Sequence, residues 1–276
     1  ELVAEFFSDL GTVLLRLLGD GLTATLAAFA GGAVLMVIVA VLLGVAEHQG
    51  PGWLQVIARV IVELFRGTSL VVQLFFIFYV IPTFTGFDLG STWTAIVALG
   101  LNYGAYGAEV VRGSLNAVPA GQWETTTALS MPWLTKMRRV IWPQAWALML
   151  PGFNNLMVML VKGTAVVGLV LLADLTFEAE QLRRQVGTWP AFIGAMLIYY
   201  VIALVVSTIM RIMERRAQRR LGLGDFEIAQ ARKQADEALA GAATPLDTGN
   251  GVLTPADLVP EPRRPAAPRR PGGGDA

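Results

Sequence analysis

Isolated polar and ionisable side chains lie within long apolar segments of this sequence, and they are the residues that could do chemistry. Glu109 and Lys162 are the ionisable ones. A charged group inside a membrane-spanning helix is costly, so it usually faces a protein interior or a water-filled cavity. We expect Glu109 and Lys162 to pair with each other in a structural or gating role, with direct contact to a solute as the alternative.

Uncharged hydrogen-bonding residues occur at similar depth in the same segments: Gln73, Asn102, Tyr103, Asn154, Asn155 and Thr164. Amides and hydroxyls in such segments commonly bridge neighbouring helices. A binding site for a small polar solute needs only a few of them. Together with Glu109 and Lys162 they are our candidates for a solute pathway, and helix bridging is the alternative role for each.

The sequence holds none of the short motifs that mark common catalytic or metal sites. It has no cysteine, no lysine followed by serine or threonine, no H-E-x-x-H pair and no G-x-S-x-G elbow. Its single histidine, His48, is expected to be a solvated loop residue. The formal net charge of zero gives no electrostatic case for nucleic acid. We therefore predict no catalytic residue, no metal and no cofactor on this chain.

The elements that must position these residues are long apolar helices. The chain is 54% hydrophobic and 15% charged, whereas a soluble domain usually carries about a quarter charged residues. A bilayer core of about 30 Å needs about 20 apolar residues of helix, and the alternation typical of membrane strands is absent. We predict an all-α membrane protein of about five transmembrane helices, near residues 22–46, 68–84, 92–111, 145–172 and 191–212.

The remaining segments suggest three parts of the chain. Residues 1–20 predict an amphipathic helix that lies on the membrane surface or packs against the helix bundle. Residues 21–220 form the transmembrane domain, with an interfacial helix at 53–66 and a mixed-charge loop at 174–190. Residues 221–276 are a tail with a short polar helix near 222–240. From Pro245 the tail is rich in Pro, Gly, Ala and Arg, and we expect it to be largely disordered.

The distribution of lysine and arginine predicts the orientation, because loops rich in these residues stay in the cytoplasm. In a five-span arrangement most of them fall on one side, and only Arg183 and Arg184 fall in a loop on the other. We therefore expect the N-terminus outside and the tail in the cytoplasm.

The connection at 112–144 is unusually long for a link between two spans. Pro119, Pro132 and Pro143 divide it, and proline favours the first turn of a helix. We predict two short helices, at about 120–130 and 132–142, with Glu124 in the first turn of the first helix. Two helices along the cytoplasmic face would form a docking platform for a soluble partner.

This stretch resembles the cytoplasmic coupling loop of bacterial ABC-importer permeases, whose pattern is Glu-Ala-Ala, three residues, Gly, nine residues, Ile, one residue, Leu-Pro. Glu124 and Pro143 match this pattern, whereas Thr125 and Thr126 replace the two alanines and Ser130 replaces the glycine. The preceding segment VPAGQWE at 118–124, which contains Gly121, also resembles the family. VELFRGTSLVVQLFF at 62–76, GAEVVRG at 107–113 and LVKGTAV at 160–166 resemble the polar-amino-acid branch of that family. Because Ser130 replaces the glycine, we expect its φ to be negative and its side chain to cap the next helix.

The resemblance covers residues 20–220 and implies a type I ABC importer permease in a bacterial inner membrane. It implies three kinds of protein partner: a separate ATPase subunit that holds ATP and Mg²⁺, an extracytoplasmic solute-binding protein, and a second permease chain, identical or related. The permease would work by alternating access. An ion or solute channel is the alternative from the residues alone, and a membrane enzyme is a second one.

Three segments resemble the ectoine and hydroxyectoine permeases more than those for glutamine or histidine. They are RGTSLVVQLF at 66–75, LGLNYGAYGAEVVRG at 99–113 and LADLTFEAEQLR at 172–183. The implied solute is a zwitterion whose carboxylate would meet Lys162 or Arg66 and whose cation would face Glu109 or a tyrosine. A polar amino acid is the alternative.

Overall fold

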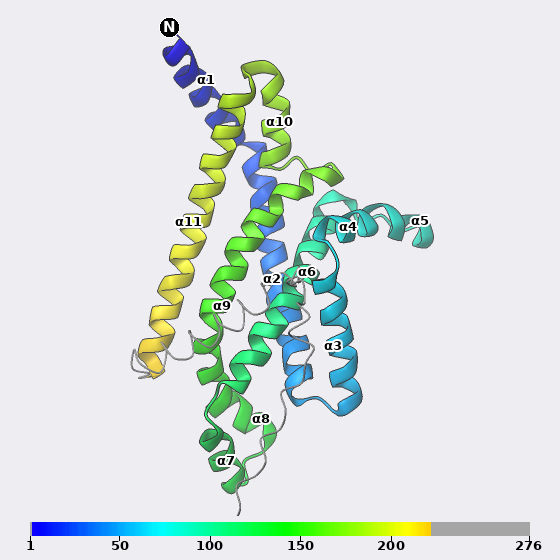
Figure 1. Cartoon of the computed structure of the whole chain (residues 1–276), viewed down its shortest axis with the longest axis vertical. Coiled ribbons are helices and arrows are strands. Elements are labelled where there is room, and N and C mark those ends of the chain that lie inside the picture. Colours follow the sequence, from blue (N-terminus) through cyan, green and yellow to red (C-terminus); the bar gives the residue numbers. More distant parts are fainter. Residues whose placement is uncertain (1, 222–276) are drawn as a thin grey trace, which may run out of the picture. The chain divides into compact units, whose positions relative to one another are not determined.

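The computed structural model describes residues 2–221, and this part of the chain is all-α, without a strand. The helices before the long connection are α1 (Leu2–Leu17), α2 (Asp20–Gln49), α3 (Gly52–Gly67), α4 (Leu70–Phe75), a π-helical turn (Phe76–Val80), α5 (Ile81–Thr85) and α6 (Gly90–Asn116). After them come α7 (Ala120–Ala128), α8 (Trp133–Lys136), a second π-helical turn (Met137–Ile141), α9 (Trp142–Gly163), a 3₁₀ turn (Thr164–Val170), α10 (Leu175–Val186) and α11 (Thr188–Leu221). Figure 1 shows α7 and α8 at one end of the bundle and α10 at the other.

Helices lie at all five predicted spans, although they differ in apolarity. Three continuous helical segments are long and apolar enough to cross a bilayer: Gly21–Gln49, Trp133–Val170 and Thr188–Arg219. Gly52–Gly67 and Leu70–Thr85 pass the same test only as a pair, and the chain bends by 103° between them, as in a broken span or a re-entrant loop. With its 27 residues α6 is about 40 Å long. About half of its residues are buried among the other helices, so it can carry polar residues that a lipid-facing helix would not.

The most extensive helix packing in the described part of the chain is between α2 and α6. A Cβ atom at Gly44 would lie 2.6 Å from the Ala108 carbonyl oxygen, and one at Gly104 would lie 2.7 Å from the Val39 side chain. Small residues allow helices in a membrane to approach this closely. The two helices therefore pack backbone against side chain along most of their length.

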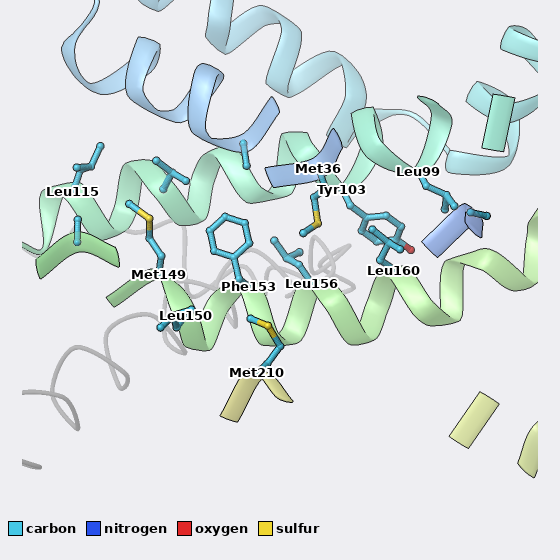
Figure 2. Close-up of a cluster of buried hydrophobic side chains, with 14 of the residues drawn as sticks. Met36, Leu99, Tyr103, Leu115, Met149, Leu150, Phe153, Leu156, Leu160 and Met210 are labelled. Atoms are coloured by element: carbon cyan, nitrogen blue, oxygen red, sulfur yellow. The ribbon is translucent and has the colours of Figure 1, made fainter. Parts of the chain in front are cut away.

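A buried apolar cluster joins these two helices to α9 and α11. Met36 on α2, Leu99 on α6, Phe153 and Leu160 on α9 and Met210 on α11 meet in it (Figure 2). The cluster fixes the rotation of α9, and so decides which of its polar side chains face away from the bundle.

Several predicted boundaries were wrong. The segment at 174–190 is largely helical, because Asp174 caps α10 by accepting hydrogen bonds from the backbone N–H groups of Thr176 and Phe177. The second short helix of the connection is not separate. It continues through the π-helical turn into α9, with Pro143 near the start of α9, where a missing N–H is tolerated.

Two further segments pack against the bundle. In α1, Val13 and Leu17 are fully buried against α10 and α11, while Leu15 is exposed. This half of α1 therefore packs against the helix bundle, which was one of the two predicted alternatives. The expected interfacial helix, α3, lies beside α2 and α6 and buries Ala58 and Val62 (Figure 1). The predicted tail lies outside the described residues.

Candidate functional site: the loop at 112–144 and the polar residues of the bundle

The turn between α7 and α8 has a left-handed residue at its centre. Ser130 has a φ of 50°. The backbone N–H of Met131 donates to Thr126 O at 3.1 Å, and that of Ser130 donates to Thr127 O at 2.9 Å. This pair of bonds is the Schellman ending of a helix, which places a left-handed residue at this position. The prediction of a negative φ was therefore wrong, and no side chain caps α8, whose N-cap is Pro132.

The loop presents a mixed polar and apolar surface at the end of the bundle. Gly121, Glu124 and Thr125 are exposed on α7, whereas Thr126 is buried and donates its hydroxyl to Trp123 O at 2.9 Å. Glu124 lies in the second turn of α7, not the first, because the helix begins at Ala120. Its carboxylate is therefore too far from the N-terminus of α7 to gain much from the helix dipole.

Large apolar side chains surround these polar ones. Leu129 and Leu134 are each 68% exposed, and Trp133 is 50% exposed. The exposed surface formed by Glu124, Thr125, Leu129, Trp133 and Leu134 is called the loop surface below. Pro143 is also exposed, in the first turn of α9.

Several candidate pathway residues bridge helices. Gln73 donates to Phe65 O at 2.9 Å and to the Thr68 hydroxyl at 2.6 Å, and it accepts from the Asn102 amide at 3.2 Å. Tyr103 on α6 donates to Met159 O on α9 at 3.1 Å. These contacts satisfy polar groups inside the bundle and stabilise the sharp bend after α3.

The other candidates divide into buried and exposed ones. Thr164 is fully buried and donates to Val161 O at 2.7 Å. Asn154 is half-buried, and its side-chain oxygen has no hydrogen-bond partner among the described residues. Asn155 and Lys162 are exposed and, with the exposed Met159 between them, lie on one face of α9.

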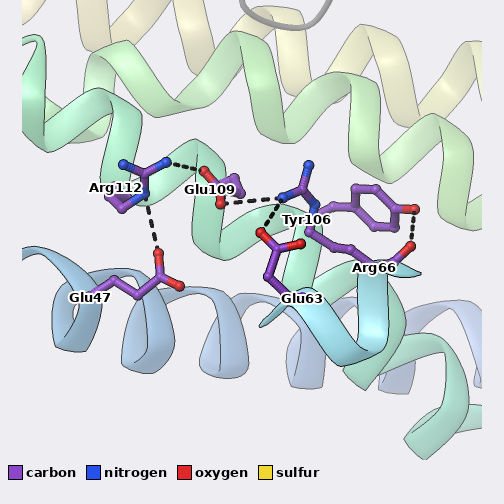
Figure 3. A network of polar contacts seen from close by, with 6 residues as sticks. All are labelled: Glu47, Glu63, Arg66, Tyr106, Glu109 and Arg112. Carbon is purple, nitrogen blue, oxygen red and sulfur yellow. Dashed lines mark hydrogen bonds and ion pairs between the residues drawn. The ribbon is translucent and has the colours of Figure 1, made fainter. Parts of the chain in front are cut away.

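The expected pair of Glu109 and Lys162 was wrong. Glu109 instead pairs with Arg66 on α3 at 3.3 Å and with Arg112, one turn further along α6, at 2.6 Å (Figure 3). Glu109 is near the loop end of α6, whereas Lys162 is in the last turn of α9, which runs away from the loop. Helix direction thus separates two residues that appear complementary in the sequence.

An ion-pair network extends from Glu109 to neighbouring helices, and its carboxylate on α2 was missed. The distance from Arg112 Nε to Glu47 Oε2 is 3.2 Å, and the Glu47 side chain is 1% exposed. This pair has ion-pair distance but lacks the alignment of a hydrogen bond, so neither Glu47 oxygen has a hydrogen-bond partner among the described residues. Glu47 falls just beyond the predicted first span, which made it look like a loop residue.

Arg66 occupies the other end of the network. It lies 3.7 Å from Glu63, its guanidinium carbon is 5.5 Å from the centre of the Tyr106 ring, and its backbone carbonyl accepts the Tyr106 hydroxyl at 3.3 Å (Figure 3). The network therefore joins α2, α3 and α6 near the loop end of the bundle.

A second polar cluster lies near α10. Asp174 is fully buried and accepts from the Tyr199 hydroxyl at 3.1 Å, and Thr25 accepts the N–H of Leu175 at 3.0 Å. Burial raises the pKa of the Asp174 carboxyl, against the opposing effect of its backbone hydrogen bonds. The cluster joins α2, α10 and α11, and no charge pattern in the sequence indicated it.

Comparison with known proteins agrees with this arrangement. Residues 36–219 match the family described as the binding-protein-dependent transport system inner membrane component. A probable amino-acid ABC transporter permease of Sinorhizobium fredii, y4tF, is 43% identical over 58% of this chain and 70% of that relative. The arginine transport system permease ArtQ of Bacillus subtilis is 32% identical over 71% of this chain and 90% of that relative.

Solved structures share the fold. The crystal structure of an amino acid ABC transporter with histidines is 28% identical, with a TM-score of 0.66, over 75% of this chain and 94% of the other. An inward-facing structure of the MetNI methionine ABC transporter has a TM-score of 0.61 at 20% identity, over 74% and 96% of the two chains, and shows the fold alone. The predicted fold, an all-α type I ABC importer permease, is confirmed. With well over half of its 276 residues matched, this multi-pass membrane chain belongs to the family of binding-protein-dependent transport system inner membrane components, which are transport subunits without a catalytic site of their own.

Proposed function

We propose that this chain is the permease of an ATP-driven importer and that the loop surface docks a separate ATPase subunit, which binds ATP and Mg²⁺. The observation that carries the proposal is the exposure of Leu129, Trp133 and Leu134 beside Glu124, at the end of the bundle. Exposed apolar patches rimmed by polar residues mark protein–protein interfaces. A channel has no need of such a surface, which argues against that alternative.

Co-purification tests this docking directly. Glu124→Lys reverses a charge in the middle of the loop surface, and a charge-assisted hydrogen bond to a buried partner contributes about 1.5–3 kcal/mol. The variant should insert normally but retain far less ATPase subunit during purification. Glu180→Lys reverses a charge on α10, at the other end of the bundle, and should retain as much as wild type (Figure 1). Equal retention by Glu124→Lys and wild type would refute the docking site.

The proposed orientation places α1 and α10 outside and α7, α8 and the end of α11 in the cytoplasm. Arg211, Arg215, Arg216 and Arg219 at the end of α11 and Lys136, Arg138 and Arg139 after α7 support it through the excess of positive charge on one side. Protease added to sealed right-side-out vesicles should spare a tag placed after Ala276. Digestion of that tag without lysis would overturn the orientation.

We further propose that the exposed face of α9 with Asn155, Met159 and Lys162 borders the solute pathway and is covered by a second permease chain. A lysine facing the lipid core would cost about 2.5–3.5 kcal/mol. No carboxylate among the described residues pairs with Lys162. Within this part of the chain, the ammonium group of Lys162 is therefore free to bind the carboxylate of a solute.

The proposed solute is a small zwitterion of the amino-acid class. The relatives support this class, since their names include an arginine, a cystine and an octopine transport permease. Ectoine is the second candidate, and the segments at 66–75, 99–113 and 172–183 favour it. Competition among labelled ectoine, arginine, glutamine, histidine and glutamate for uptake by the reconstituted complex separates the two. Amino-acid uptake that excess ectoine leaves unchanged would eliminate ectoine.

A further inference from the structure

The last turn of α2 carries three consecutive polar side chains that each contact a different element. Glu47 lies 3.2 Å from Arg112 on α6. The His48 ring stacks on Trp123 of α7, with ring centres 5.6 Å apart and planes 26° apart. Gln49 accepts a hydrogen bond from the indole N–H of Trp133 on α8 at 2.6 Å. Successive residues of a helix point in directions about 100° apart, so one turn can reach three neighbours.

The loop residue that His48 contacts is itself packed against the bundle. The carbonyl of Trp123 accepts the hydroxyls of Thr126 and Thr127, at 2.9 Å and 2.8 Å. Trp123 also packs against the buried cluster that joins α2, α6 and α9. His48 is therefore not the solvated loop residue expected from the sequence. It belongs to the last turn of α2, and its ring stacks against α7, the helix that carries Glu124.

On its other side the same turn is attached to a rigid pair of helices. Gly44 lies one turn before His48, and there is no room for even a methyl group between it and the Ala108 carbonyl and Val111 of α6. A displacement of the last turn of α2 must therefore move α6 as well. The Glu47–Arg112 pair adds a second connection between the same two helices.

Two of these residues carry buried polar atoms that the described part of the fold does not satisfy. The Glu47 oxygens and His48 Nδ1 are buried without a hydrogen-bond partner among residues 2–221. Leaving buried polar atoms unsatisfied costs free energy that apolar side chains would avoid. Polar residues that leave some of their atoms unsatisfied and yet contact three elements fit a role in motion.

We propose that Glu47, His48 and Gln49 are positioning residues that transmit the displacement of α7 and α8 to the α2–α6 pair during transport. The inference rests on the proposed docking of an ATPase on the loop surface. It predicts that loss of these contacts uncouples ATP hydrolysis from transport while the complex still assembles.

The test uses the full chain reconstituted in vesicles with its ATPase and binding protein. His48→Ala combined with Gln49→Ala should lower the solute imported per ATP hydrolysed by about fivefold or more, the range of a typical coupling energy. ATPase retention and basal ATP hydrolysis should stay at wild-type levels. His48→Phe keeps an aromatic ring against Trp123 and should keep most of the coupling. Gln144→Ala removes an amide that donates to Val140 O, one turn earlier in the same continuous helical segment, and is the matched control.

The chain has no cysteine, so a covalent rescue is possible. His48→Cys with Trp123→Cys should uncouple the complex in the same way, and a short bifunctional maleimide across the two thiols should restore solute import per ATP. An unchanged ratio in the double alanine variant would overturn the inference. Loss of ATPase retention in that variant would also overturn it, because the contacts would then be merely structural. Failure of the wild-type chain to retain an ATPase would instead refute the proposed function.

Discussion

At the scale of single residues, the structure explains why one position of the coupling-loop pattern carries glycine in the family. Ser130 holds the left-handed position that ends α7, with a φ of 50°. For a residue with a Cβ this conformation costs about 1–2 kcal/mol. This helix ending is made by two backbone hydrogen bonds from Ser130 and Met131 to the last turn of α7. The residue type at position 130 does not reveal those bonds, so it led to the wrong sign of φ.

Ser130→Gly should therefore stabilise the protein by about 1 kcal/mol, because glycine adopts a positive φ without strain. The melting temperature of the purified permease measures the effect. Ser130→Ala is the control and should bring no gain, since alanine retains the Cβ. A melting temperature for Ser130→Gly at or below that of Ser130→Ala would contradict the left-handed turn.

The same scale shows which site residues could be predicted from sequence. Polar residues inside spans were identifiable by type, because charges and amides are rare in apolar helices. Their partners were not, because Glu109 could reach Arg66, Arg112 or Lys162 depending on helix direction and rotation. Only the packing of α6 against α3 selects Arg66.

At the scale of elements, charge-free apolar runs were sufficient to predict the helices of the bundle. The 103° bend after α3 was not predictable from them, since it depends on Gln73 donating back to Phe65 O and to Thr68 across the break. The helix α10 was missed because mixed charges outweighed the capping role of Asp174. The predictions failed where a side chain satisfies the backbone at an interruption of a helix.

The close packing of α2 and α6 makes a prediction about Gly44. Gly44→Ala places a methyl group 2.6 Å from the Ala108 carbonyl oxygen, and overpacking of this kind typically costs about 1–3 kcal/mol. Thermal unfolding should show this loss. Gly113→Ala, in the same pair of helices, has open space around the added methyl and should be neutral or slightly stabilising. Equal melting temperatures for the two variants would show that the helices are not in close contact at Gly44.

The buried Asp174 predicts a dependence of stability on pH. Because burial raises the pKa of this carboxyl in the folded protein, the folded state binds the proton more tightly than the unfolded state. Its contribution to stability is thus fully present below the ordinary pKa of aspartate and is lost as the pH rises through the raised folded value. The melting temperature of wild type relative to Asp174→Asn should increase as the solution is acidified from neutral pH. A pH-independent difference would contradict the raised pKa.

At the scale of the whole molecule, the described part of the chain places two different surfaces at two ends of one bundle. The loop surface lies at the end with α7 and α8, and α10 lies at the other (Figure 1). Between them, α9 exposes Asn155 and Lys162, and the α2–α6 pair extends from one end to the other. A subunit that converts the nucleotide cycle of a partner into alternating access needs a docking surface, a solute pathway and helices that connect them. It needs no catalytic group, because it acts only through contacts that differ between its two conformations.

Uptake by proteoliposomes that contain the permease, its ATPase and its binding protein tests this account most directly. We predict that labelled amino acid or ectoine accumulates only when ATP is present on the side of the ATPase. Accumulation should be lost with Glu124→Lys and retained with Gln144→Ala. Solute entry that needs neither ATP nor the ATPase, and that Glu124→Lys leaves unchanged, would contradict the account and indicate a channel.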